Sequence, residues 1–185
     1  MTILNEGDAF LFMKIGTHAN EELATIIARK KREIADAGFA MWGYGGNTCH
    51  PRTMVQPFVR EYEDEARPIL LCMHPMTSRH FAEQVRAEEF SVDGRAWNPI
   101  PTEINVLGSR YALCIKDLHE VDESISLAQT RVAVGNSKGR RGSDYIKGHV
   151  DKACLEVVRE ASEPPDFKIG LIAELTDPYA VFLRN

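Results

Sequence analysis

Hydrophobic and polar positions along the 185 residues predict more strands than helices. Short apolar runs bounded by turn residues are typical of buried strands. Such runs occupy residues 9–15, 39–44, 68–74, 109–118, 126–134, 169–174 and 179–183. The polar stretch 119–124 predicts that the two runs beside it form an antiparallel pair, and the turn residues 176–178 predict a terminal hairpin from the last two runs.

Helical spacing of apolar residues is clearest between Asn20 and Gly38. Asn20 is suited to cap the N-terminus of this helix and Gly38 its C-terminus. The cationic run 29–32 lies within it beside acidic residues and is expected to form a solvated face. Capping residues and periodicity predict further helices over residues 58–66, 77–89 and 144–158.

The order of these elements shows no regular alternation of strand and helix. It predicts a single α+β domain over residues 1–185 with a mixed, largely antiparallel sheet and three or four packed helices. The sheet is either open or curled into a partial barrel. A chain of this length that is 44% hydrophobic is able to bury one sizeable core.

Composition narrows the function classes. A net charge of −5 argues against a protein that coats nucleic acid over its whole surface, because that mode needs a basic face. Four cysteines lack the short paired spacing of zinc or thioredoxin-like motifs, and Cys72 and Cys114 lie in apolar runs where thiols are buried. Without a signal-peptide pattern or an apolar run of ~18 residues, a soluble cytoplasmic protein with no membrane partner is expected.

The glycine-rich segment 41–52 is the strongest candidate for a site. Trp42 and Tyr44 lie two positions apart, so on a strand both project from one face and form a platform for a planar ligand. Glycine lets the backbone approach such a ligand closely. The residues expected to contact the ligand here are Trp42, Tyr44, Gly45, Gly46, Asn47, Thr48 and Arg52. The alternative is that the aromatic residues are core residues and the glycines only turn a corner.

A second candidate is the cationic loop 135–149. Residues 138–152 contain five Lys or Arg against two Asp, a local charge of +3. A helix predicted to begin at Ser143 would direct unpaired N–H groups toward this loop, which favours phosphate. Lys138, Arg140, Arg141 and Ser143 are therefore expected to bind phosphate, although the spacing is not that of a Walker loop. A charged surface loop without a ligand is the alternative.

Catalysis has weaker support in the sequence. Cys49, His50 and His74 are candidate nucleophile and proton carriers, but adjacent side chains on extended backbone point apart, so Cys49 and His50 do not form a dyad with each other. Zinc ligation by cysteine and histidine in these segments lacks the usual spacing, so no metal is predicted. No particular cofactor is indicated.

These patterns favour a binding module for a nucleotide-like or phosphate-bearing ligand, which includes a nucleic acid base or a short single strand. The hypothesis requires the glycine-rich segment and the cationic loop to border one hollow. One rival is a small hydrolase or transferase that acts on a phosphorylated ligand through Cys49 or His50. Another is a structural or interaction protein with no small-molecule site.

Overall fold

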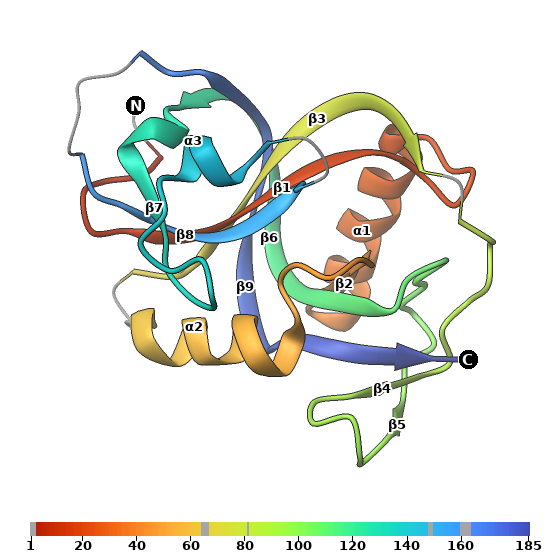
Figure 1. Ribbon diagram of the computed structural model, residues 1–185. Coiled ribbons are helices and arrows are strands. Elements are labelled where there is room, and N and C mark those ends of the chain that lie inside the picture. The colour runs from red at the N-terminus through yellow and green to blue at the C-terminus, as the bar shows by residue number, and fades with distance from the viewer. Residues whose placement is uncertain (1–2, 64–66, 81, 148–149, 160–163) are drawn as a thin grey trace.

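The computed structural model describes residues 3–63, 67–80, 82–147, 150–159 and 164–185 (Figure 1). Its strands are β1 (Ala9–His18), β2 (Ala40–Tyr44), β3 (Leu70–His80), β4 (Glu89–Ser91), β5 (Asn98–Pro99), β6 (Tyr111–Ile125), β7 (Thr130–Val132), β8 (Lys152–Val157) and β9 (Phe167–Arg184). Its helices are α1 (Leu23–Ala37), α2 (Gln56–Tyr62) and α3 (Gly142–Tyr145), with a π-helical turn η1 (Pro51–Val55) and a 3-10 turn η2 (Leu127–Gln129).

One mixed sheet runs through the described residues in the order β2-β6-β9-β3-β1-β8-β7, with β4 and β5 attached to β9. The β1–β3 pair is parallel and the other pairs are antiparallel. The predicted α+β class with a mixed, largely antiparallel sheet is therefore confirmed. The partial barrel and the three or four packed helices are not confirmed, since no described pairing joins the two edges of the sheet and α3 has only four residues.

Residues 9–13 of strand β1 are all apolar because both faces of this part of the strand are covered. Phe10 and Phe12 pack into a core shared with β8, while Leu11, Met13 and Ile15 pack into the core on the other face. A strand covered on both sides has no polar face, which explains its continuous apolar sequence. The strand predicted over residues 9–15 is confirmed.

Helix α1 confirms the clearest helical prediction. Gly38 ends the helix with φ 84°, a left-handed conformation that glycine adopts without strain, and its N–H donates to the Ile34 carbonyl. The N-cap residue of this helix is Glu22 rather than the predicted Asn20. The helix covers part of the sheet beside β1 and β2 (Figure 1).

The two longest strands bend together. Figure 1 shows β9 turning sharply near its middle, and β6 follows it. Their pairing shifts register at three places, one of which is next to Asp117, a residue with φ 51°. Register shifts of this kind are β-bulges, which bend a strand and increase its twist. The bend brings β1 and β2 to one hollow although three strands separate them in the sheet.

Two predicted helices are wrong. Residues 77–80 continue β3, and the described residues 82–88 are not helical. In place of a helix over 144–158, the chain forms the single turn α3 and then β8, whose side chains are buried. The strand pairing of β8 with β1 and β7 outweighs local helix propensity there.

The predicted strand pairs are also wrong. β7 pairs with β8 and not with β6, and residues 169–183 form no terminal hairpin. They belong instead to the continuous strand β9, which pairs with β6 along most of its length. The residues at the bend in β9 are of the same types as those in a turn between two strands. The sequence pattern therefore predicts a hairpin where the chain forms one bent strand.

Gly43 allows the segment 104–109 to pack directly on β2. A Cβ atom at Gly43 would lie 2.3 Å from Ser109 Oγ and 2.7 Å from Val106 Cγ1. These distances leave no room for a side chain. The close approach places Val106 and Ser109 beside the hollow described next.

We expect Gly43→Ala to destabilise the protein by roughly 1–3 kcal/mol through overpacking. Urea unfolding followed by circular dichroism measures the change. Gly45→Ala is the matched control, because a Cβ at Gly45 meets nothing within 4 Å. Equal stability of the two variants would contradict the close packing of segment 104–109 on β2.

Candidate functional site

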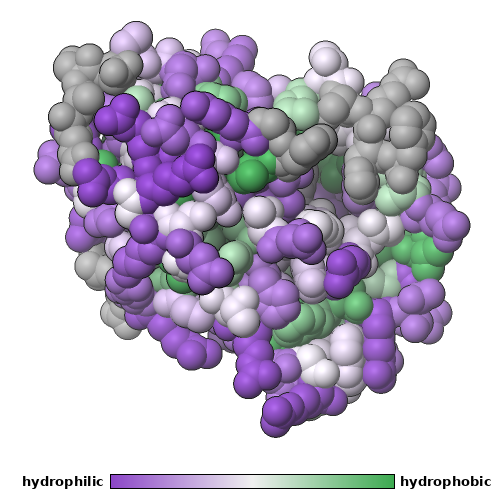
Figure 2. Space-filling model, in the orientation of Figure 1, coloured by the Kyte–Doolittle hydropathy of each residue, from purple (hydrophilic) through white to green (hydrophobic). Residues whose placement is uncertain are grey.

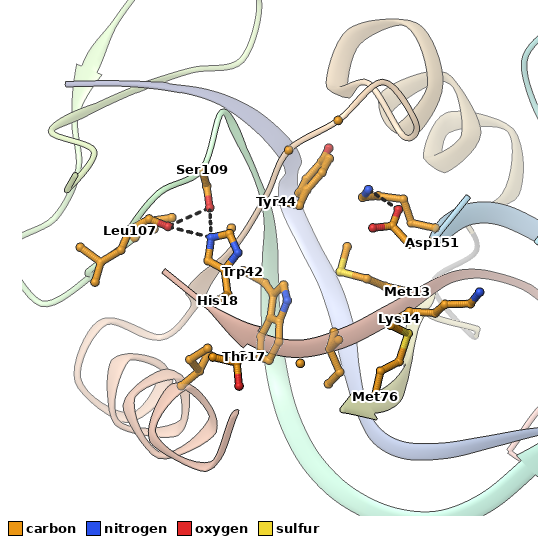
Figure 3. A pocket seen from close by; sticks show the side chains of 18 of the residues that line it. Met13, Lys14, Thr17, His18, Trp42, Tyr44, Met76, Leu107, Ser109 and Asp151 are labelled. Atoms are coloured by element: carbon orange, nitrogen blue, oxygen red, sulfur yellow. Dashed lines mark hydrogen bonds and ion pairs between the residues drawn. The ribbon is translucent and has the colours of Figure 1, made fainter. Parts of the chain in front are cut away.

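A cavity of about 560 Å³ opens between α1 and the bent sheet (Figure 3). Its walls come from the end of β1, from β2 and the loop after it, from one face of α1, and from the segments before β6 and β8. The volume lies within the range of ~300–1,000 Å³ in which small-molecule sites fall.

Trp42 and Tyr44 form the aromatic wall of this cavity. Both project from the same face of β2, and both are largely buried. The Tyr44 hydroxyl donates a hydrogen bond of 2.5 Å to the Cys49 carbonyl, which fixes the ring and ties the glycine-rich segment to β2. No described residue accepts a hydrogen bond from the Trp42 indole N–H, and it is not sealed in the core. Trp42 therefore borders the cavity with the small part of its surface that is exposed, 5%, and has an unused donor (Figure 3).

The backbone of Gly45 and Gly46 forms part of the rim. Gly46 has φ 80°, and a Cβ there would lie 3.7 Å from Lys152 Nζ. Asn47 and Thr48 continue the rim. Because neither glycine has a side chain, main-chain groups remain open to a molecule in the cavity.

Lys152 brings a positive charge to this rim. Its side chain is 5% exposed, and Nζ lies 2.6 Å from Asp151 Oδ1 and 3.3 Å from Thr48 Oγ1. The same ammonium lies 5.8 Å from the centre of the Tyr44 ring. Asp151 is half-exposed, so an anionic ligand at the rim would share Lys152 with a partly solvated carboxylate.

A polar group of three residues lies at another part of the wall. His18 Nε2 lies 3.1 Å from the Leu107 carbonyl oxygen, to which Ser109 Oγ also donates at 3.0 Å. A carbonyl only accepts, so Nε2 carries the hydrogen in this arrangement. In Figure 3 the Trp42 indole lies between this group and the side chains of Met13 and Met76.

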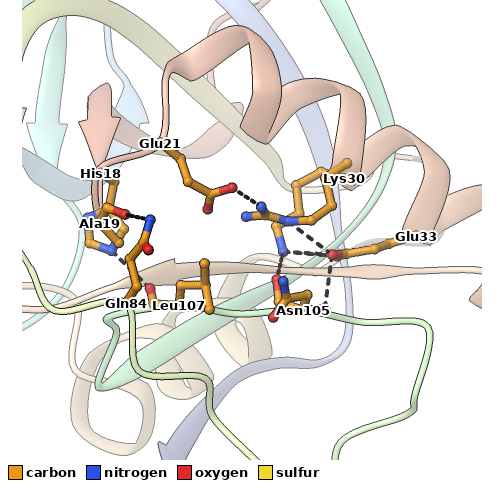
Figure 4. A network of polar contacts seen from close by, with 9 residues as sticks. His18, Ala19, Glu21, Lys30, Glu33, Gln84, Asn105 and Leu107 are labelled. Carbon is orange, nitrogen blue, oxygen red and sulfur yellow. Dashed lines mark hydrogen bonds and ion pairs between the residues drawn. The ribbon is translucent and has the colours of Figure 1, made fainter.

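A buried ionic network closes the α1 wall (Figure 4). Lys30 Nζ lies 2.9 Å from Glu33 Oε2 and donates to the Asn105 carbonyl at 2.7 Å, and the Asn105 N–H donates to Glu33 at 3.0 Å. Arg29 pairs with Glu21 beside it. Desolvation by burial lowers the pKa of Lys30 to about 8, against the opposing attraction of Glu33. The network joins α1 to segment 104–109. It corrects the solvated face expected for residues 29–32 at Arg29 and Lys30, whereas Lys31 and Arg32 are exposed.

Positive charge exceeds negative charge around the cavity. The ionisable lining residues other than histidine and tyrosine are Lys14, Arg29, Lys30 and Lys152 against Glu21 and Asp151, a formal charge of +2, which becomes +1 when Glu33, the buried partner of Lys30, is counted with them. The whole chain carries −5. An anion is therefore favoured in the cavity relative to the rest of the surface.

Most of the predicted ligand residues in the glycine-rich segment line the cavity, whereas those in the cationic loop do not. Six of the predicted ligand residues line it, namely Trp42, Tyr44, Gly45, Gly46, Asn47 and Thr48. The other five do not, namely Arg52, Lys138, Arg140, Arg141 and Ser143. The described residues of the cationic loop therefore do not border this cavity, although a Cβ at Gly135 would lie 3.4 Å from the side chain of Met54, two residues beyond the glycine-rich segment. Ser143 lies in the one-turn α3, so the long helix expected to begin there is absent.

None of the three catalytic candidates lines the cavity, and their side chains contact different partners. Cys49 is buried against Cys154, and this contact, together with burial, raises the pKa of the Cys154 thiol. His50 Nδ1 accepts from the Thr53 N–H at 3.4 Å, and His74 Nδ1 hydrogen-bonds the Lys168 carbonyl at 2.6 Å.

Metal ligands are not grouped either. Within the described ranges, no three His, Cys, Asp or Glu side chains are placed to hold a metal ion. All four cysteines are free and buried, as expected for Cys72 and Cys114.

Sequence reasoning missed the cavity residues of β1 and of segment 150–152. Met13, His18 and Lys152 line the cavity with Trp42, although they are distant from it in the chain. Lys152 was expected in a helix and is the first residue of β8. The only local sign of a site in these segments is that the strand β1 ends at His18. This sign does not show which distant residues lie across the cavity from it.

No protein-family model, curated protein or solved structure matches this chain. None of the helices in the described part of the chain has the length and apolar character needed to span a membrane. What the protein binds is therefore inferred from the chemistry of the cavity.

We expect Lys30→Met to destabilise the protein by about 3–5 kcal/mol at pH 7, because it leaves the Glu33 carboxylate buried without its main partner. The double variant Lys30→Met/Glu33→Leu should recover part of this loss. Urea unfolding of the wild type and both variants measures the difference. A single variant as stable as the wild type would contradict the network.

The same network has a defined pH dependence. The folded-state pKa of Lys30, about 8, lies below its ordinary value of 10.5, so the unfolded chain binds more protons between these values. The free energy of unfolding of the wild type should therefore rise relative to that of the double variant between pH 8 and pH 10. A difference that is constant across this range would show that Lys30 keeps its ordinary pKa.

Proposed function

We propose that the cavity binds the base of a nucleotide, so that the protein is a binding module for nucleotide-like ligands. The observation that carries the proposal is the Trp42 indole, which borders the cavity with an unused N–H donor. Nucleobases combine a planar ring with hydrogen-bond acceptors at its edge. Stacking of a base on an aromatic side chain contributes about 1–3 kcal/mol.

Other parts of the cavity suit the remainder of such a ligand. The Met13 and Met76 thioethers supply polarisable apolar surface beside the ring. Lys152 and the open backbone of Gly45 and Gly46 lie at the rim, where a phosphate attached to the base would emerge. Lys152 thus takes the phosphate-binding role nearest to the base, and Asn47 and Thr48 add polar contacts.

The rival functions have less support. Hydrolysis or group transfer through Cys49 or His50 would require those side chains at the ligand, and neither lines the cavity. A protein in which the glycines only turn a corner would not need a cavity of about 560 Å³ behind that corner.

We expect Gly45→Leu to weaken the binding of mononucleotides by at least about tenfold, the equivalent of one lost stacking contact. Gly45 borders the cavity, and a Cβ atom there meets nothing within 4 Å, so a larger side chain is accommodated without strain and competes with the ligand for space. Isothermal titration calorimetry with AMP, GMP, CMP and UMP measures the affinities.

Gly45→Ala is the matched control and should bind within about twofold of the wild type, since one methyl group obstructs little of the cavity. Circular dichroism and thermal unfolding check that both variants are folded. Wild-type protein that binds none of the four mononucleotides at millimolar concentration would overturn the proposed function. Binding that is unaffected by Gly45→Leu would place the ligand outside this cavity.

A further inference from the structure

Several arginines outside the cavity have no side-chain hydrogen bond or ion pair in the described part of the chain, and three of them belong to the glycine-rich segment and the cationic loop. Arg52, Arg140 and Arg141 are exposed, and their side chains form no hydrogen bond or ion pair with described residues. We call these three residues the arginine surface. The nearby lysines differ, because Lys138 pairs with Glu61 and Lys147 pairs with Asp144.

The arginine surface is adjacent to the cavity rim. Two residues after Lys152 of the rim, the Cys154 carbonyl on β8 accepts a hydrogen bond from the Ala133 N–H at 2.9 Å. The neighbouring Val132 N–H donates to the Arg140 carbonyl at 2.8 Å, which places the backbone of Arg140 close to the strand that leads to the rim.

A second contact supports the same placement. Arg52 belongs to the turn η1, whose Met54 side chain lies against Gly135 at the start of the cationic loop. The backbone thus leads from Lys152 at the rim through β8 and β7 to Arg140, and Arg52 lies on the turn that contacts the start of the cationic loop.

Charge at this place is opposite to that of the whole protein. The chain carries −5, while residues 138–152 carry +3. Hydrophilic side chains cover the face over β7 and α3 (Figure 2). A polyanion is repelled by the protein as a whole and attracted here, so a charged partner would be oriented by this surface.

We propose, on the basis of the proposed function, that the nucleotide belongs to a single-stranded nucleic acid whose phosphates run from the cavity rim over Arg52, Arg140 and Arg141. One base enters the cavity and stacks on Trp42, and the following phosphates contact the arginine surface. Basic tracks combined with aromatic stacking positions are the usual means of binding single strands.

A single strand fits better than a free nucleotide or a duplex. The phosphate of a free nucleotide would be reached by Lys152 at the rim, which leaves the three arginines without a function. In a duplex the base must first be unpaired and unstacked, at a cost of a few kcal/mol. A single strand presents its bases at the lowest cost.

The test compares ten-nucleotide single strands of DNA and RNA with the mononucleotide that the protein binds best. Fluorescence anisotropy and calorimetry measure affinities between 50 and 200 mM NaCl. If Lys152 and each of the three arginines contact one phosphate, the affinity for the oligonucleotide should fall about 50-fold over this range, from the counterion release of four contacts. Arg140→Gln/Arg141→Gln should reduce this fall to about sevenfold and leave mononucleotide binding unchanged.

Arg32→Gln/Arg95→Gln is the matched control, because it removes the same charge from exposed arginines that do not line the cavity. The inference is supported if an oligonucleotide binds at least about tenfold more tightly than the mononucleotide and only the Arg140/Arg141 variant loses this gain. It is overturned, with the proposed function intact, if mononucleotides bind and no oligonucleotide binds more tightly. It is overturned together with the proposed function if neither mononucleotides nor oligonucleotides bind.

Discussion

The shared bend of β6 and β9 is the constraint on which the cavity depends. A flat sheet in the order β2-β6-β9-β3-β1 would place β1 and β2 far apart. Register shifts along the β6–β9 pair bend both strands, so that the ends of β1 and β2 come to face one hollow. The backbone thus builds the hollow, and the side chains at these strand ends decide what it binds.

Two further features keep the walls in place. Segment 104–109 lies directly on β2 because Gly43 has no side chain. The same segment is bound to α1 through Asn105, which contacts both Lys30 and Glu33. A buried ion pair is costly to desolvate, so it contributes less to stability than to fixing one arrangement of α1 against the sheet. Together they hold α1, β2 and segment 104–109 around the cavity and leave the Trp42 indole at its surface.

Local patterns in the sequence correctly predict those elements whose tertiary contacts agree with the intrinsic helix or strand propensity of their residues. β1, α1 and β2 are of this kind, as is the placement of Trp42 and Tyr44 on one face of β2. The helix expected over 144–158 fails because pairing with β1 and β7 makes β8 a strand. Lys30 was expected in solvent because a charge run usually lies there, but it is buried and donates to the carbonyl of the distant Asn105. The cavity joins residues more than a hundred positions apart, and no local pattern records such a contact.

The most direct test of the account uses the indole N–H resonances of the protein's two tryptophans. In ¹⁵N-labelled protein, Trp42 and Trp97 each give one such signal, and Trp97→Phe assigns them. Trp97 packs under Arg184 on another part of the molecule and is the internal control. Addition of a mononucleotide should shift the Trp42 signal in a saturable manner, through ring stacking and a new hydrogen bond, and leave the Trp97 signal in place. A Trp42 signal that stays unchanged while the protein binds the nucleotide would contradict the central claim.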